Sequence, residues 1–134
     1  MPLNLMEHYL VLTDDIEVTR GFYLDILGLE DGFRPPLEFP GYWLYLKQTP
    51  VLHIAEWKTY TQHAKTQGIP VSKRAKSTGA FDHIAFNGTD PDDMITRLDK
   101  HGLGYDRNDV PHANLVQLFL TDPNGVKIEL NFAV

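Results

Sequence analysis

The chain repeats itself around a histidine, and this repeat constrains the fold more than any other feature of the sequence. The segments MEHYLVLTDDIEVTRGFYLDILGLE and FDHIAFNGTDPDDMITRLDKHGLGY place His8 and His83 at matching positions near their starts. A glycine follows each histidine at nearly the same spacing, at positions 28 and 102. A chain of 134 residues with such an internal repeat is expected to contain two copies of one structural unit.

Each copy is predicted to be a β-α-β-β-β unit, which places the chain in the α+β class. In the first copy, apolar side chains recur at helical spacing between a cap at Thr13 or Asp14 and a stop at Gly28. In the second copy, Asp90 is the expected cap, Pro91 follows it, and a glycine again ends the helix. Predicted strands cover residues 4–12, 42–47, 51–56, 81–86, 104–110, 115–121 and 126–132, with a weaker strand at 31–37.

The two units are predicted to form one domain that spans residues 1–134. The first module covers residues 1–56 and the second covers residues 80–134. A linker at residues 57–79 joins them, because this segment is polar, contains glycine and proline, and carries the basic cluster SKRAK. A short helix at residues 60–66 is the regular structure expected within this linker.

Composition excludes several classes of function. The formal net charge of −6 argues against nucleic-acid binding, which needs a basic face. No run of about 18 apolar residues is present, so no membrane-spanning helix is expected. The start MPLNLMEHYL lacks the basic and apolar parts of a signal peptide, and a cytoplasmic location is therefore the default expectation. The absence of cysteine excludes disulfides and thiolate metal ligands.

Four polar residues fall at two symmetric pairs of strand positions. Matching VLHIAE with KIELNF puts His53 and Glu129 at equivalent places on the last strand of each unit, as His8 and His83 are on the first. Taken singly, each would fit a solvent-facing position on a half-buried strand. As a matched set they favour a common role, because two histidines and one carboxylate have the composition of non-haem Fe(II) sites.

These residues resemble the vicinal oxygen chelate superfamily, which includes glyoxalase I, extradiol dioxygenases and the fosfomycin- and bleomycin-resistance proteins. The resemblance covers essentially the whole chain and is strongest from FDHIAF through DPNGVKIELNF. It implies two modules that form a half-barrel around a divalent metal held by His8, His83 and Glu129. Glyoxalase-type members take a fourth ligand, usually glutamate, from the place where this chain has His53. The resemblance also implies a homodimer, with each metal site built within one chain or across two.

One stretch favours the extradiol branch of this superfamily. The segment VPHANLVQLFLTDPNGVKIE resembles the extradiol signature, although Phe119 stands where that signature has tyrosine. The residues that fit the signature are His112, Leu118, Asp122, Pro123, Gly125 and Glu129. The resemblance then implies Fe(II), with Mn, Ni, Co or Zn as alternatives, and cleavage of a catechol-like ring beside its two oxygens. His112 would donate a hydrogen bond to a substrate oxygen, or else be a loop histidine in solvent, and His53 would be a base or a ligand.

Aromatic residues are the expected lining of a substrate pocket. Tyr45 and Phe119 are predicted to match each other across the duplication and to face the interior, and Trp43 is a third candidate. Core packing is the alternative explanation for such rings. The expected ligand of this pocket is a small molecule that presents two vicinal oxygens.

Three other functions are weighed against the dioxygenase. A glyoxalase-type lyase needs a carboxylate where His53 stands, and Glu56 is expected to face the opposite side of its strand. A metal-free binding protein of the bleomycin-resistance type fits the net acidity and the tryptophan-bearing cleft, but it would not need the three candidate ligands. Modification of fosfomycin would need a cation-binding loop and a thiol-donor site that the sequence does not reveal.

Overall fold

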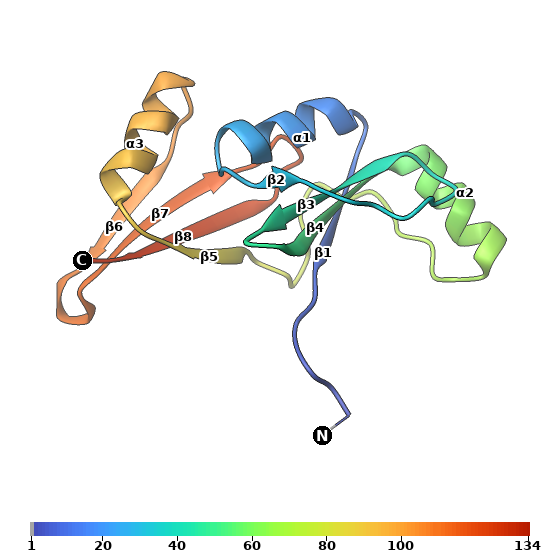
Figure 1. Ribbon diagram of the computed structural model, residues 1–134, viewed down its shortest axis with the longest axis horizontal. Helices are drawn as coiled ribbons and strands as arrows, with labels where there is room; N and C mark the ends of the chain where they lie inside the picture. The colour runs from blue at the N-terminus through green and yellow to red at the C-terminus, as the bar shows by residue number, and fades with distance from the viewer. Residues whose placement is uncertain (1) are drawn as a thin grey trace. The chain divides into compact units, whose positions relative to one another are not determined.

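The structure is a computed structural model in which residues 2–134 are described, and its ribbon is shown in Figure 1. The chain divides into two compact units, Met1–Arg74 and Ala75–Val134. Among the described residues, none of the helices has the length and apolar character needed to cross a membrane.

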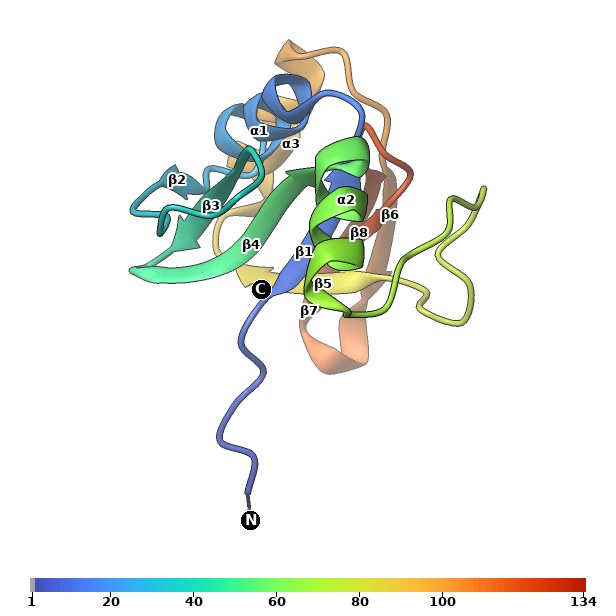
Figure 2. The ribbon, with the colours of Figure 1, turned by 90° about the vertical axis from the view of Figure 1, so that its right-hand side faces the viewer.

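The first unit is a β-α-β-β-β module followed by a helix. Its elements are β1 (Tyr9–Thr13), α1 (Ile16–Asp25), β2 (Glu30–Asp31), β3 (Gly41–Leu46), β4 (Thr49–Glu56) and α2 (Trp57–Gln67). The sheet order is β1-β4-β3-β2, with β1 parallel to β4 and the other neighbours antiparallel. Helix α1 contacts β3 and β4, while α2 contacts β4 and lies alongside it in Figure 2.

The second unit repeats this topology. Its elements are β5 (Ile84–Gly88), α3 (Pro91–Lys100), β6 (Asp106–Val110), a short 3-10 helix (Pro111–Ala113), β7 (Leu115–Thr121) and β8 (Lys127–Ala133). The sheet order is β5-β8-β7-β6, again with the first and last strands parallel. The predicted duplication of a β-α-β-β-β unit is therefore confirmed.

Each sheet buries one face, and the last strand of each unit shows how. In β8, Ile128, Leu130 and Phe132 are buried, whereas Glu129 between them is only half-buried. Strand β4 repeats the pattern about His53. Burying each large apolar side chain is worth about 1.5–3 kcal/mol, so a slip by one residue would be costly and the register is fixed. His53 and Glu129 thus occupy the face of each sheet that the core leaves open.

Helix α1 starts one residue later than predicted. Its cap is Asp15, whose carboxylate accepts two backbone N–H groups at 3.1 Å, and not Thr13 or Asp14. Thr13 is buried instead, and its hydroxyl oxygen accepts a hydrogen bond from the Thr19 hydroxyl at 2.9 Å. The helix stops at Asp25, ahead of the predicted stop at position 28. Three adjacent polar residues offer a capping oxygen here, and tertiary packing selects the last of them.

Helix α3 has the predicted start. The Asp90 carboxylate accepts the backbone N–H of Asp93 at 3.0 Å, and Pro91 occupies the first helical turn. Gly102 follows the helix with a φ of 65°, a conformation that favours glycine. The cap, the proline and the terminal glycine all act locally, which is why the sequence predicts them correctly.

The predicted first strand of each module is too long at its N-terminal end. Strand β1 starts at Tyr9 and β5 starts at Ile84, so His8 and His83 lie immediately before their strands and not within them. The weaker strand predicted at residues 31–37 is reduced to the pair Glu30–Asp31, because the two prolines that follow cannot donate ladder hydrogen bonds.

The segment 57–79 contains more regular structure than a linker. Helix α2 fills its first half, and Gly68 caps that helix with a φ of 70°. The first compact unit extends to Arg74, which stacks over the Trp57 ring at 4.9 Å and pairs with Asp14. The division between the two units falls after this contact.

Candidate metal and substrate site

Strand register gives His53 and Glu129 equivalent places in the two sheets. On β3, Trp43 lies directly across from His53, and on β7, Phe119 lies directly across from Glu129. On the first strand of each unit, the residue that pairs with His53 or with Glu129 is the second residue after that unit's histidine, His8 or His83. The equivalent strand placement of His53 and Glu129 is therefore confirmed, while His8 and His83 match each other at the position immediately before their strands.

The same register shows that Trp43, and not Tyr45, is the counterpart of Phe119, so the predicted match of Tyr45 with Phe119 is wrong. The β3–β4 ladder shifts register between Leu44 and Leu46, which leaves Tyr45 without a partner on β4. The Tyr45 hydroxyl donates to the Phe33 carbonyl at 2.6 Å, and its ring covers the α-carbon of a glycine at position 32. A β-bulge of this kind does not reveal itself in residue alternation.

The first unit brings His8 and His53 together. Their rings stack with centroids 3.6 Å apart and planes 16° from parallel. Trp43 stacks on the His53 ring at 4.1 Å and 6°. His53 is therefore held between two flat rings, which fixes the plane of its imidazole.

Burial, with smaller contributions from the neighbouring His8 and Arg34, lowers the pKa of His53 to about 4. The His53 imidazole is consequently neutral near pH 7. Neutral imidazole is the form that donates a lone pair to a metal ion. The electrostatics of this histidine thus fit a ligand role.

The second unit brings His83 and Glu129 together. His83 Nε2 lies 3.4 Å from Glu129 Oε1. Two ligand atoms with bonds of about 2.1 Å to one cation, at angles of roughly 90–110°, are separated by about 3.0–3.4 Å. The observed separation therefore fits two neighbouring ligands of one divalent ion.

A carboxylate holds the other ring nitrogen of each first-strand histidine. His8 Nδ1 lies 2.9 Å from Glu7 Oε1, and His83 Nδ1 lies 2.7 Å from Asp82 Oδ2. Lys127 Nζ pairs with Asp82 at 2.8 Å, and Lys127 and His83 together hold the pKa of that carboxyl below its usual value. A carboxylate on one ring nitrogen orients a histidine whose other nitrogen binds metal. The sequence contains this signal as an acidic residue directly before each histidine, although neither acidic residue is among the predicted site residues.

A ladder of side-chain amides ends on Glu129. Asn131 Nδ2 donates to Glu129 Oε2 at 2.8 Å, Gln117 Nε2 donates to Asn131 Oδ1 at 3.0 Å, and Asn108 Nδ2 donates to Gln117 Oε1 at 2.8 Å. The donors lie opposite one another on β8, β7 and β6. We call these three residues, Asn108, Gln117 and Asn131, the amide ladder. It fixes the second carboxylate oxygen and leaves Oε1 facing His83.

Comparison with known proteins decides the family. The family model of the Glyoxalase/Bleomycin resistance protein/Dioxygenase superfamily matches residues 5–130. The chain belongs to this superfamily. Among curated protein sequences, a search finds no match.

Solved structures of the superfamily's fold are similar to this chain over nearly its whole length. A lactoylglutathione lyase from Agrobacterium tumefaciens superposes with a TM-score of 0.72 at 18% identity, covering 98% of this chain and 96% of that one. A glyoxalase family protein from Bacillus anthracis gives 0.71 at 20% identity, covering 98% and 97%. A fosfomycin resistance protein from Listeria monocytogenes gives 0.67 at 15% identity, covering 100% and 96%. At these identities the likeness shows the fold of the superfamily and not the reaction.

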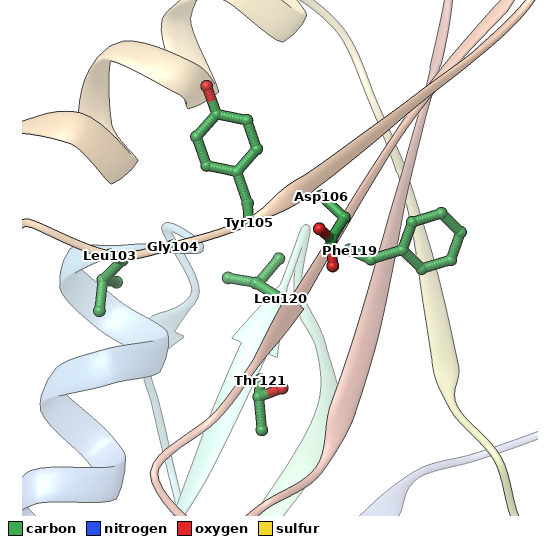
Figure 3. Close-up of a pocket in the computed structure, with 7 residues that line it drawn as sticks. All are labelled: Leu103, Gly104, Tyr105, Asp106, Phe119, Leu120 and Thr121. Carbon is green, nitrogen blue, oxygen red and sulfur yellow. The ribbon is translucent and has the colours of Figure 1, made fainter.

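The remaining predicted site residues of this superfamily member lie on the second unit. His112 is exposed on the short 3-10 helix between β6 and β7. Phe119 lines a cavity of about 480 Å³ together with Tyr105 and Asp106. Figure 3 shows the Phe119 ring on the opposite side of its strand from the Leu120 side chain.

Within residues 2–134, no three His, Asp or Glu side chains are grouped closely enough to hold a metal ion. Instead, each unit of this superfamily member presents two candidate donors, His8 with His53 and His83 with Glu129. The donor chemistry fits a divalent transition metal, because imidazole and carboxylate together suit Fe, Mn, Co, Ni and Zn.

Proposed function

We propose that this superfamily member is a metal-dependent enzyme that binds its substrate through two vicinal oxygens, and that it is an extradiol dioxygenase acting on a catechol-like diol. The observation that carries the proposal is the pair His83 Nε2 and Glu129 Oε1, 3.4 Å apart, with the other nitrogen and the other oxygen each held by a neighbouring side chain. Such double fixation is what a preorganised ligand pair requires.

The proposed ligands are His8, His83 and Glu129, with His53 as a fourth ligand or as a base near the substrate. Because the described pairs belong to different modules, a complete site needs one pair from each. In the proposal, these come from one chain or from two chains of a homodimer.

The cation, Fe(II) in this proposal, would favour ionisation of the bound diol and deliver electrons to dioxygen. Protein residues then orient and desolvate the substrate. Glu7 and Asp82 keep the Nδ1 atoms of their histidines occupied, so that each Nε2 points to the ligand position. His112 is the proposed donor to a substrate oxygen, reaching it from the loop between β6 and β7.

Metal content and oxygen consumption test the proposal. We expect about one equivalent of divalent metal in protein purified without chelator, lost in His83→Ala and in Glu129→Gln but retained in His101→Ala. His101 is a matched control because it caps the C-terminal end of α3, outside the site. After anaerobic loading with Fe(II), a panel of catechols should consume oxygen and give a ring-opened yellow product.

Each alternative has a distinct outcome in this experiment. Proton exchange on a hemithioacetal, without oxygen consumption by any diol, would move the chain to the lyase branch. If the wild-type chain binds no divalent metal, the proposed metal-dependent activity is refuted, and a metal-free binding protein is the remaining alternative. If His53→Ala binds metal with unchanged affinity, His53 is not a fourth ligand, and its alternative role as a base near the substrate remains.

A further inference from the structure

The first unit contains a cavity of about 210 Å³ beside the His8–His53 pair. Three aromatic rings line it, Phe39, Trp43 and Tyr60. Among the described residues, no carboxylate lines this cavity, although the chain carries a net charge of −6. The cavity therefore brings aromatic rings, imidazoles and one guanidinium together in an acidic protein.

Arg34 supplies a cation to this cavity without a compensating anion. Its Nη2 donates to the Phe39 carbonyl at 2.6 Å, and its guanidinium carbon lies 5.0 Å from the centroid of the Phe39 ring. The Nε atom is buried and has no hydrogen-bond partner. Within residues 2–134, none of the ion pairs includes Arg34. Burial lowers the pKa of Arg34, as expected for a cation that lacks an anionic partner.

His63 adds a second unsatisfied nitrogen to the same cavity. Its Nδ1 is buried and makes no hydrogen bond, and the Oε2 atom of Glu38, an exposed residue, is 3.7 Å away. The centroid of the His63 ring lies 4.7 Å from that of the Phe39 ring and 5.9 Å from that of the Tyr60 ring. Buried polar groups without partners are rare, and each calls for an explanation such as a ligand.

We propose that this cavity binds the acidic group of the substrate, and that the substrate is a single-ring aromatic vicinal diol bearing a carboxylate. The inference rests on the proposed function for the diol end. Arg34, through its guanidinium, receives the carboxylate, and His63 donates a second hydrogen bond to it. A planar fork of N–H donors matches a carboxylate better than a point charge does.

The size of the cavity supports one ring. A cavity of about 150 Å³ holds benzene, so 210 Å³ accommodates a benzene ring with a small acidic substituent. The flat surfaces of Trp43 and Tyr60 suit such a ring.

The first experiment isolates the acid subsite from the metal. Binding of benzoate and of uncharged benzamide is measured by tryptophan fluorescence and calorimetry on the full chain, as purified and after chelator treatment. We expect benzoate to bind both preparations and benzamide to bind at least 10-fold more weakly. Arg34→Met should weaken benzoate binding roughly 10- to 100-fold without a comparable change for benzamide. Equal binding of the two compounds by the wild-type chain would overturn the inference.

Two variants separate the charge from the fold. Arg20→Met is the matched control, because Arg20 is an arginine of the same unit that already pairs with Asp31. Its benzoate affinity should stay within 2-fold of wild type. Arg34→Lys keeps the charge, so it should retain more benzoate affinity than Arg34→Met. If Arg34→Met has a lowered melting temperature, Arg34→Lys and Arg34→Gln with wild-type melting curves replace it in the test. Benzoate affinity that is unchanged from wild type in both of these variants overturns the role of Arg34.

The second experiment uses the metal-loaded chain. With Fe(II) bound anaerobically, 3,4-dihydroxybenzoate should bind at least 10-fold more tightly than catechol, and this preference should disappear in Arg34→Met. If benzoate binds and no metal does, the proposed function fails while the acid subsite stands. If catechol and 3,4-dihydroxybenzoate are turned over with equal affinity, the proposed function stands and the acid subsite fails.

Discussion

Replacing Asn131 tests whether the amide ladder positions Glu129 for metal binding. Asn131 donates to Glu129 Oε2 at 2.8 Å and accepts from Gln117 at 3.0 Å. A hydrogen bond to a charged acceptor is worth about 1.5–3 kcal/mol and a neutral one about 0.5–1.5 kcal/mol. Because Asn131 is only half-buried, water replaces part of both, and we expect Asn131→Ala to lower the free energy of unfolding by about 1–2 kcal/mol.

The effect on metal affinity should be larger than the effect on stability. Partners that orient a ligand typically contribute 10- to 100-fold to metal affinity. We therefore expect Asn131→Ala to weaken Co(II) or Zn(II) binding roughly 10- to 100-fold in a chelator competition assay. Gln117→Ala, one hydrogen bond further from Glu129, should weaken metal binding less than Asn131→Ala does. Asn108→Ala should weaken it less again.

The control for this series is Asn87→Ala. Asn87 is opposite Asn131 in the sheet, but its amide donates to the Asn131 backbone carbonyl at 3.3 Å and does not extend to Glu129. Its metal affinity should match that of the wild type. If Asn131→Ala binds metal as tightly as Asn87→Ala does, or if the three ladder variants show no gradient, the reasoning is refuted.

Three further changes have defined outcomes. Asp82→Ala should weaken metal binding roughly 10-fold by releasing His83 Nδ1, whereas an unchanged competition curve would contradict that role. Asp90→Ala should lower the free energy of unfolding by about 0.5–2 kcal/mol through loss of the α3 cap, and Asp90→Asn should restore most of it in urea titrations. Arg74 holds the pKa of Asp14 below 3.8, so this pair stabilises the fold above pH 3.8 and the benefit is lost as the pH falls through the lowered pKa. Asp14→Asn should therefore lower the melting temperature at pH 7 and at low salt, with the difference vanishing in strong acid or at high salt.

The elements that the sequence predicts well are those whose signals are local. Strand β7 has the predicted bounds, because its buried and open positions alternate without interruption. Helix α3 has the predicted cap for the same kind of reason, since Asp90, Pro91 and Gly102 each act within one turn. The matched places of His53 and Glu129 followed from the repeat alone. These features depend on neighbours in sequence, and residue patterns record them.

The features that the sequence analysis missed depend on pairing between strands. The register of β3 against β4 makes Trp43, and not Tyr45, the counterpart of Phe119, and alternation within β3 cannot reveal this. The amide ladder needs the registers of three strands before its members become neighbours. The cavity at Arg34 combines a proline-containing loop with α2, a helix expected to be shorter. Each requires tertiary contacts that no single segment specifies.

The two units keep one backbone frame but orient their candidate ligands differently. In the second sheet, the residue two positions after Glu129 on β8 is Asn131. Asn131 and its paired amide residues on the neighbouring strands form a row that fixes the carboxylate by directed hydrogen bonds. In the first sheet, the corresponding row beyond His53 is Leu12, Ala55 and Gly41, which offer no side-chain hydrogen bond. His53 is fixed instead by stacking between Trp43 and its neighbouring histidine. The carboxylate is held by donors to its lone pairs, whereas the His53 imidazole is held by the rings on its two faces and by a backbone hydrogen bond with Pro50. The divergence of the two rows therefore follows from the chemical type of the ligand that each one supports.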